Sequence, residues 1–278
     1  MVEIKSQDDF LNLTENQFIG TIPQLKNSQI RFEGTGNVLV CEEGVTLCDT
    51  KINFHGNNSI VYLCANCHEY KLNINTYHNS VFYIGKDNYI NGALNVILSE
   101  EKHVFIGSGG LFSFGIWMRN ADPHLIYDVD TKKRLNNTKS IFIGDHVWVG
   151  QSALLLKGTQ LYSGSILAAG AVISSKKVMS NTCWGGNPAK ELKTDIFWDG
   201  ACVHAWTKKQ AKEKSTYASD CYIYENEPKA FLDFKELECQ IEAKSVSERV
   251  DYLQKLSQMT SKNRFACKAT TKPKRWFK

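Results

Sequence analysis

The sequence predicts an all-β solenoid, a parallel β-helix built from hexapeptide repeats. From residue 141 to 179 an aliphatic residue returns at every sixth position: Ile143, Val149, Leu155, Leu161, Leu167, Ile173 and Met179. A small or β-branched residue stands two places before most of them: Ile141, Val147, Ala153, Thr159, Ser165 and Ala171. A period of six fits neither an α-helix nor a plain strand. It fits a chain that coils through three short faces per turn, with one inward aliphatic side chain per face.

Residues 30–99 show the same architecture in a less regular form. Short apolar alternations such as Ile30-Arg31-Phe32 and Val81-Phe82-Tyr83-Ile84 are punctuated by Gly, Asn and Asp. This pattern predicts strands of about three to five residues separated by turns. We interpret them as degenerate coils of the same solenoid, with an irregular sandwich as the alternative. Residues 1–29 lack a clear repeat and are expected to form an N-terminal cap, so the β-helix domain is predicted to span residues 30–199.

The repeat is interrupted once. A polar stretch, about residues 119–139, separates two well-patterned segments and contains Asp122-Pro123 and Asn136-Asn137. An insertion of this kind in a strict solenoid is expected to be a loop extruded from one corner, and such loops usually carry function.

The β pattern ends after Trp198. Thr207 is suited to cap a helix over 208–214, and Ser245 with Glu248 forms a capping-box signature ahead of an apolar helical stretch. Residues 200–278 are therefore predicted to form a small, mainly helical C-terminal region with a basic tail. Residues 201–278 carry a net charge of +6, whereas residues 1–200 carry −2. This surplus suggests an anionic partner, either a polyanionic glycan or a membrane surface.

Composition limits the class of protein. The apolar runs are too short for a transmembrane helix, and the start MVEIKSQDDF shows no secretory signal. The nine cysteines have no framework spacing and are expected to be reduced thiols of a cytoplasmic protein.

Several motifs resemble the hexapeptide-repeat acyltransferases: IGDHVWVG (143–150), LLKG (155–158), GSILAAGAVIS (164–174) and GGNPAKELK (185–193). With RNADPHLIYDVD (119–130), the chain is most similar to bacterial O-acetyltransferases of capsular and surface polysaccharides. The likeness is firm over about residues 100–199 and absent from 201–278. It implies a left-handed β-helix, acetyl-CoA as the donor, and a homotrimer whose active sites lie between subunits.

His124 is the candidate general base. It lies in the extruded loop, and transfer of an acetyl group from a thioester to a sugar hydroxyl needs a base near neutral pH. The resemblance supports this role, and the alternative is an ordinary surface histidine in a turn. Asp122 or Asp128 would orient the imidazole ring, and the sequence does not choose between them.

Trp148 is the second candidate. Val147 and Val149 take inward positions, so strand alternation turns Trp148 outward. The resemblance places it beside the catalytic histidine, and packing against a neighbouring subunit is an alternative that is compatible with that role. Phe142 is also predicted to point outward and to need a neighbouring subunit to cover it.

The coenzyme groove is predicted along the small residues 168–171, where a thin pantetheine arm can approach the backbone. By resemblance, acetyl-CoA contacts fall on Gln151, Ala169, Ser174, Lys190 and Lys193. The lysines would face its phosphates, although Lys176 and Lys177 compete for that role. Corner packing is the structural alternative for the small residues.

Other chemistry is disfavoured. Direct attack on a thioester needs no nucleophilic Cys or Ser. Cys64-Ala-Asn-Cys67-His68 matches a haem-attachment pattern, but it lies in a strand-rich stretch without an export signal. No histidine pair has the spacing of the zinc-binding solenoid carbonic anhydrases, so no metal is expected.

The sequence therefore predicts an acetyl-CoA-dependent O-acetyltransferase that modifies sugar hydroxyls of a bacterial capsular or surface polysaccharide. The alternatives are N-acetylation of an amino sugar nucleotide and a non-catalytic scaffold. The expected partners are acetyl-CoA, a glycan acceptor of anionic type and two further copies of the chain, with no nucleic acid. The basic tail also offers contact with the inner face of a membrane.

Overall fold

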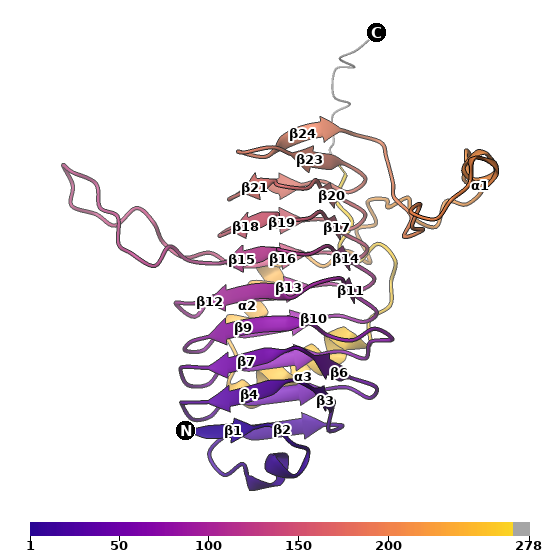
Figure 1. Ribbon diagram of the computed structural model, residues 1–278. Coiled ribbons are helices and arrows are strands. Elements are labelled where there is room, and N and C mark those ends of the chain that lie inside the picture. Colours follow the sequence, from indigo (N-terminus) through magenta and orange to yellow (C-terminus); the bar gives the residue numbers. More distant parts are fainter. Residues whose placement is uncertain (269–278) are drawn as a thin grey trace.

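The computed structural model describes residues 1–268 and shows a stack of coils whose strands line up in long parallel sheets (Figure 1). The predicted fold class is confirmed: a left-handed parallel β-helix with an extruded loop and a small helical C-terminal part. Part of the predicted basic tail, residues 269–278, lies outside the described residues.

Three long sheets form the faces of the solenoid. The first sheet consists of β1 (Val2–Ile4), β4 (Gln29–Phe32), β7 (Lys51–Phe54), β9 (Leu72–Thr76), β12 (Leu94–Leu98), β15 (Trp117–Arg119), β18 (Leu154–Leu156) and β21 (Val172–Ile173). The second sheet consists of β2 (Gln17–Gly20), β5 (Val38–Cys41), β8 (Ile60–Leu63), β10 (Val81–Ile84), β13 (Val104–Ile106), β16 (Ile141–Ile143), β19 (Gln160–Leu161) and β22 (Lys177–Val178). The third sheet consists of β11 (Tyr89–Ile90), β14 (Leu111–Phe112), β17 (Trp148–Val149), β20 (Ile166–Leu167), β23 (Cys183–Gly185) and β24 (Lys190–Lys193).

The ends of the stack depart from the parallel pattern. A pair of strands, β3 (Gln24–Lys26) and β6 (Thr46–Cys48), begins the third face, and the 3-10 helix η1 (Asp8–Asn12) packs its buried Phe10 at the N-terminal end. β1 pairs antiparallel with β4, and β24 pairs antiparallel with β23. Both terminal pairings supply backbone partners to coils that have no further parallel neighbour.

The interior is the column of aliphatic side chains that the repeat predicts. The predicted inward residues from Ile143 to Ile173 are at most 1% exposed. One register assignment is wrong: Val178, and not Met179, is the last inward residue, because Val178 is fully buried and pairs with Leu161. The turn after Ile173 is one residue shorter than the period, so Met179 moves outward and packs against a separate apolar cluster.

That second cluster lies between the second sheet and the C-terminal helices α2 (Phe234–Glu242) and α3 (Val246–Ser257). Phe142 stacks on Phe234 at a ring-centroid distance of 5.2 Å and is only 2% exposed. The prediction that Phe142 needs a neighbouring subunit is therefore wrong, because its own chain covers it. We call α2, α3 and the segment up to Phe265 the C-terminal cover.

A buried ion pair joins the cover to the solenoid. The Arg264 guanidinium donates from Nε and Nη2 to the two carboxylate oxygens of Asp145, each at 2.7 Å. The side chains of Arg264 and Asp145 are 6% and 13% exposed. Arg264 also donates to Ser108 Oγ at 3.1 Å, which ties the cover to the coil below. A bidentate pair of this kind fixes orientation as well as distance.

Two segments project from the body in opposite directions (Figure 1). Residues 119–139, here called the histidine arm, leave the end of β15. Residues 199–221, here called the α1 arm, carry α1 (Lys208–Glu213), whose capping box on Thr207 and Gln210 confirms the predicted helix start. No helix within residues 1–268 has the length and apolar character needed to cross a membrane.

Candidate functional site

His124 is exposed on the histidine arm, and its backbone is held firmly. The arm folds back on itself through an antiparallel bridge between Tyr127 and Arg134. The buried Asn136 side chain joins its two sides, donating to the His124 carbonyl at 2.7 Å and accepting from the Ile126 N–H at 3.0 Å. The imidazole ring therefore projects from a fixed position on a protruding segment, outside the packed interior.

Two ion pairs fix the root of the arm to the solenoid. Lys157, at the corner after β18, bonds to Asp122, and Arg134 bonds to Glu100 with Nη1 and Oε1 2.8 Å apart. The hydrogen bond from Lys157 holds the pKa of Asp122 below its usual range. Asp128 accepts from the Thr131 N–H at 2.7 Å and the Thr131 hydroxyl at 2.8 Å, which lowers its pKa.

These bonds show what Asp122 and Asp128 contact within one chain. Each carboxylate has a partner within the arm or its root, and neither bonds to the His124 ring in the described part of the chain. In a single chain, the ring of His124 is thus presented without an orienting carboxylate.

Trp148 lies outward in β17, as alternation predicts, with 39% of its surface exposed. It is the middle of an outward column on the third sheet, whose register pairs it with Leu111 below and Ile166 above. Tyr89, one coil further down the column, is 44% exposed. Within residues 1–268, the chain leaves this apolar strip partly open to solvent.

The neighbour of Trp148 is a cluster that sequence analysis missed. The His146 ring stacks on Trp198 at a centroid distance of 3.9 Å and on Tyr222 at 4.1 Å, nearly parallel to both. Trp198 in turn lies 6.1 Å from Trp148, ring centroid to ring centroid. We call Trp198, His146 and Tyr222 the aromatic clamp. Burial lowers the pKa of His146, so the ring is neutral near pH 7.

The predicted coenzyme contacts fall on different corners. Gln151 and Ala169 are exposed at successive turns of one corner, where the Gly170 N–H donates to the Gln151 carbonyl at 2.8 Å. Gly150 permits this stacking, because a Cβ there would lie 2.4 Å from the Ala169 nitrogen. Lys190 and Lys193 are exposed on β24, the last strand of the third sheet.

Ser174 lies at the next corner along the chain, after β21, and is also exposed. Its hydroxyl donates to the Lys157 carbonyl at 3.4 Å, and Lys176 and Lys177 follow it on the surface. Lys157 is the residue that anchors the histidine arm through Asp122. Ser174 is therefore nearer to the root of the arm than to Trp148 along the coil.

One chain does not bring the two principal candidates together. The histidine arm leaves from the end of β15, whereas β17 with Trp148 lies on the opposite side of the solenoid (Figure 1). The arm also exposes five apolar side chains without cover: Leu125, Ile126, Tyr127, Val129 and Leu135.

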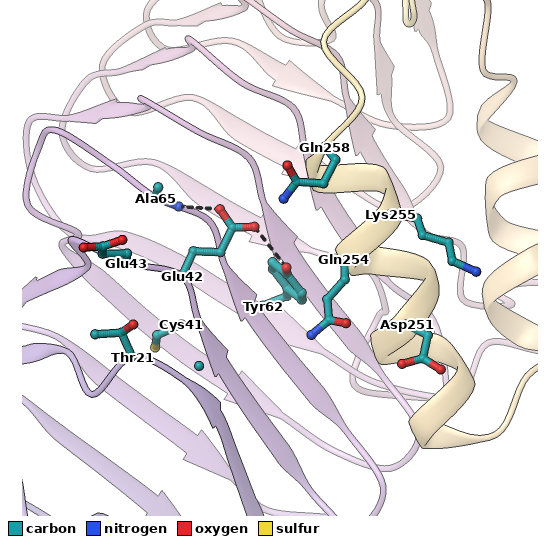
Figure 2. A pocket seen from close by; sticks show the side chains of 11 residues that line it. Thr21, Cys41, Glu42, Glu43, Tyr62, Ala65, Asp251, Gln254, Lys255 and Gln258 are labelled. Atoms are coloured by element: carbon teal, nitrogen blue, oxygen red, sulfur yellow. Dashed lines mark hydrogen bonds between the residues drawn. The ribbon is translucent and has the colours of Figure 1, made fainter.

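A cavity of about 680 Å³ lies elsewhere, between the first coils and α3 (Figure 2). Glu42 points into it and accepts hydrogen bonds from the Tyr62 hydroxyl and the Ala65 N–H, each at 3.0 Å. Glu43 and Asp251 add further negative charge, opposed by Lys255. None of the predicted site residues lines this cavity, and its acidic walls are unsuited to coenzyme phosphates.

Residues 1–268 contain no group of three or more His, Cys, Asp or Glu side chains placed to hold a metal ion. Cys64, the first cysteine of the haem-like pattern, directly follows β8. It is buried, and burial raises its pKa.

Comparison with known proteins identifies polysialic acid O-acetyltransferases among the proteins that the chain is similar to. The chain is 28% identical over 177 residues to a polysialic acid O-acetyltransferase of Neisseria meningitidis, an alignment covering 56% of this chain and 82% of the relative. A polysialic acid O-acetyltransferase of Escherichia coli O1:K1 / APEC is 36% identical over 115 residues, covering 41% of this chain and 37% of that protein. No protein-family model matches the chain.

Solved structures agree. The crystal structure of the polySia-specific acetyltransferase NeuO superposes with a TM-score of 0.62 at 28% identity, covering 72% of this chain and 93% of that one. The polysialic acid O-acetyltransferase OatWY shares the fold, with a TM-score of 0.54 at 21% identity, covering 73% of this chain and all of that one. These findings confirm the predicted kinship with hexapeptide-repeat O-acetyltransferases and the predicted enzyme class, an acyltransferase.

Proposed function

We propose that the protein transfers an acetyl group from acetyl-CoA to a sugar hydroxyl of an anionic capsular polysaccharide of the polysialic acid type, with His124 as the general base. The observation that carries the proposal is the combination of similarity to polysialic acid O-acetyltransferases with an ordered arm that presents a free imidazole.

The chemistry follows from what an imidazole does as a base. A ring nitrogen of His124 takes the proton of the acceptor hydroxyl while that oxygen attacks the thioester carbonyl. The carbon–sulfur bond then breaks, coenzyme A leaves as the thiol after receiving the proton, and the sugar carries the acetyl ester. No covalent acyl-enzyme is required.

The site is proposed to form between copies of the chain in a homotrimer. Two observations support this. The histidine arm and β17, the strand of Trp148, lie on opposite sides of one solenoid, and both the arm and the third sheet expose apolar side chains that a second copy would cover. In this arrangement Trp148 of one copy forms the wall beside the base supplied by another.

The acetyl donor is proposed to lie along the corner of Gln151 and Ala169. Side chains there are small or exposed, and the two residues lie on successive coils, which suits an extended pantetheine arm. Lys190 and Lys193 are proposed partners for the coenzyme phosphates because both are exposed on the adjacent β24. Ser174, at the next corner along the chain, is proposed to contact the coenzyme from the other side of the predicted coenzyme groove.

The predicted division of the chain into an N-terminal cap (1–29), the β-helix (30–199) and the C-terminal region (200–278) is retained as part of the proposal, with one adjustment. The solenoid begins before residue 30, because β2 and β3 pair in parallel with β5 and β6. A cytoplasmic location is proposed as well, because acetyl-CoA is produced there.

The test is acetyl transfer from radiolabelled acetyl-CoA to polysialic acid. The wild-type protein should label the polymer, and His124→Ala should lower kcat by about 10²–10⁴-fold, since a general base contributes that much. His78→Ala, at an exposed histidine of an early coil away from the third sheet, is the matched control and should act as the wild type. A His124→Ala variant that keeps more than about a tenth of kcat would refute the assignment of the base.

A further inference from the structure

The α1 arm begins and ends at a single imidazole ring. Trp198, just before the arm, and Tyr222, just after it, are both parallel to His146 at ring-centroid distances of 3.9 and 4.1 Å. Two rings at such distances cannot share one face, so they hold the imidazole between them. The chain thus leaves the solenoid on one side of His146 and returns on the other.

Hydrogen bonds reinforce this attachment. The Trp198 indole N–H donates to the His146 carbonyl, and His146 Nε2 lies equally near the Trp198 carbonyl, both at 3.1 Å. At the root of the arm, Phe197 meets Tyr217 edge-on at 5.2 Å, and the Tyr217 hydroxyl donates to Asp199 at 3.4 Å. The arm is therefore fixed at its base.

The chain does not need the α1 arm in order to connect the solenoid to the C-terminal cover. Because Trp198 and Tyr222 are separated only by the His146 ring, a short turn would join the solenoid to the cover. The arm also contributes no buried side chain through α1, so it adds nothing to the core. What the arm offers is its surface, and the arm starts directly after Trp198, whose ring lies 6.1 Å from the Trp148 ring.

The surface of the arm is strongly basic over its helix. Lys208, Lys209, Lys212 and Lys214 are all exposed, and Glu213 is the one acidic residue between Thr207 and Lys214. The Lys209–Glu213 pair is 4.0 Å apart and both side chains are largely exposed, so it neutralises little. The capping box on Thr207 fixes the start of the short helix that carries Lys208, Lys209 and Lys212, and Lys214 is its C-cap residue.

We infer that the α1 arm binds the anionic acceptor polysaccharide and holds it next to Trp148 during acetyl transfer. This inference rests on the proposed function and names how its substrate is held. A polymer with a carboxylate on every sugar is attracted to a row of lysines, and attachment at several sugars keeps the chain near the site between turnovers. An acidic membrane surface is the alternative partner for these lysines. We favour the polysaccharide because the arm is attached to the solenoid at Trp198, close to Trp148.

The experiment compares two sets of lysine variants. In the first, Lys208, Lys209, Lys212 and Lys214 are replaced by Ser. In the control, the exposed Lys229 and two exposed lysines of the C-terminal cover, Lys235 and Lys255, are replaced in the same way. With long polysialic acid at low salt, the first set should raise the KM for polymer on the order of tenfold. The kcat, the KM for acetyl-CoA and transfer to a short neutral sugar should not change, and the control should behave as the wild type.

Salt supplies a second criterion. The difference between the first set and the wild type should disappear near 1 M salt, where the Debye length falls to about 3 Å. Direct binding of fluorescently labelled polysialic acid is measured in parallel, so the inference is decided even if transfer to this polymer fails and the proposed function falls. An unchanged KM and unchanged binding would overturn the inference, as would loss of binding to acidic lipid vesicles alone. An equal loss with the short neutral sugar would also overturn it, by placing the lysines in the catalytic machinery.

Discussion

The second and third sheets carry outward columns of the same kind, yet only one is covered by its own chain. On the second sheet, successive coils align Tyr62, Tyr83, Phe105 and Phe142, all at most 2% exposed beneath the C-terminal cover. On the third sheet, the column through Tyr89 and Trp148 is 44% and 39% exposed at those two residues. An outward aromatic residue in a hexapeptide repeat is therefore not by itself a sign of a partner.

The difference separates stability from function. The covered column, together with Phe234 and Phe265, forms a second hydrophobic core that fixes the C-terminal region to the solenoid. The open column is free to meet a ligand or another copy. We therefore expect equivalent substitutions on the two faces to affect different properties.

The largest contrast should come from truncating one aromatic residue on each face. Phe142→Ala removes a buried ring and should lower the free energy of unfolding by about 3–5 kcal/mol. Trp148→Ala removes a part-exposed ring and should change stability by about 1 kcal/mol or less, while lowering acetyl transfer by about 10–10²-fold. Urea unfolding and kcat, measured on both variants, check this. The comparison fails if Trp148→Ala destabilises as much as Phe142→Ala.

A smaller effect should appear in the pH dependence of stability. His103 is buried beside the cover, accepts from the Val81 N–H at Nδ1, and has its pKa lowered by burial to about 3. Unfolded, its pKa is about 6.5, so between these values only the unfolded chain binds the proton. Stability should therefore fall as pH falls below about 6.5, approaching about 1.4 kcal/mol per pH unit from this residue.

His103→Asn tests this, because the Asn carbonyl replaces Nδ1 as the acceptor and does not titrate. Between pH 7 and 5 the variant should lose less stability than the wild type. Burial also lowers the pKa of His146, which both proteins contain. Some dependence of stability on pH should therefore remain in both. Identical slopes for the two proteins would show that His103 is not the source.

The regular part of the fold was predictable because each repeat packs mainly against its neighbours. The period places Val149 and Leu155 inward regardless of the rest of the chain. The register error at Val178 arose where one turn shortens, which changes the period without changing the composition. The coverage of Phe142 depends on Phe234, far along the chain, and local pattern carries no information about that pairing.

The site was predictable only in part for a similar reason. His124 and Trp148 occur in local motifs, so resemblance and alternation locate them. The aromatic clamp has no such signal, because His146 takes a left-handed backbone conformation (φ +51°) and meets partners from two distant segments. The proposed arrangement of His124 and Trp148 from different copies depends on how the copies assemble, so no single segment of the sequence predicts it.

The claim that the active site is shared between copies is tested most directly by mixing two variants that are each impaired in acetyl transfer. His124→Ala and Trp148→Ala chains are co-expressed in equal amounts with different tags, and acetyl transfer is measured on the mixed assemblies. If each site takes His124 from one copy and Trp148 from the next, every mixed trimer keeps one intact site. Activity should then return to about a quarter of the wild-type level. If both residues act within one chain, the mixture will be no more active than the two variants measured separately.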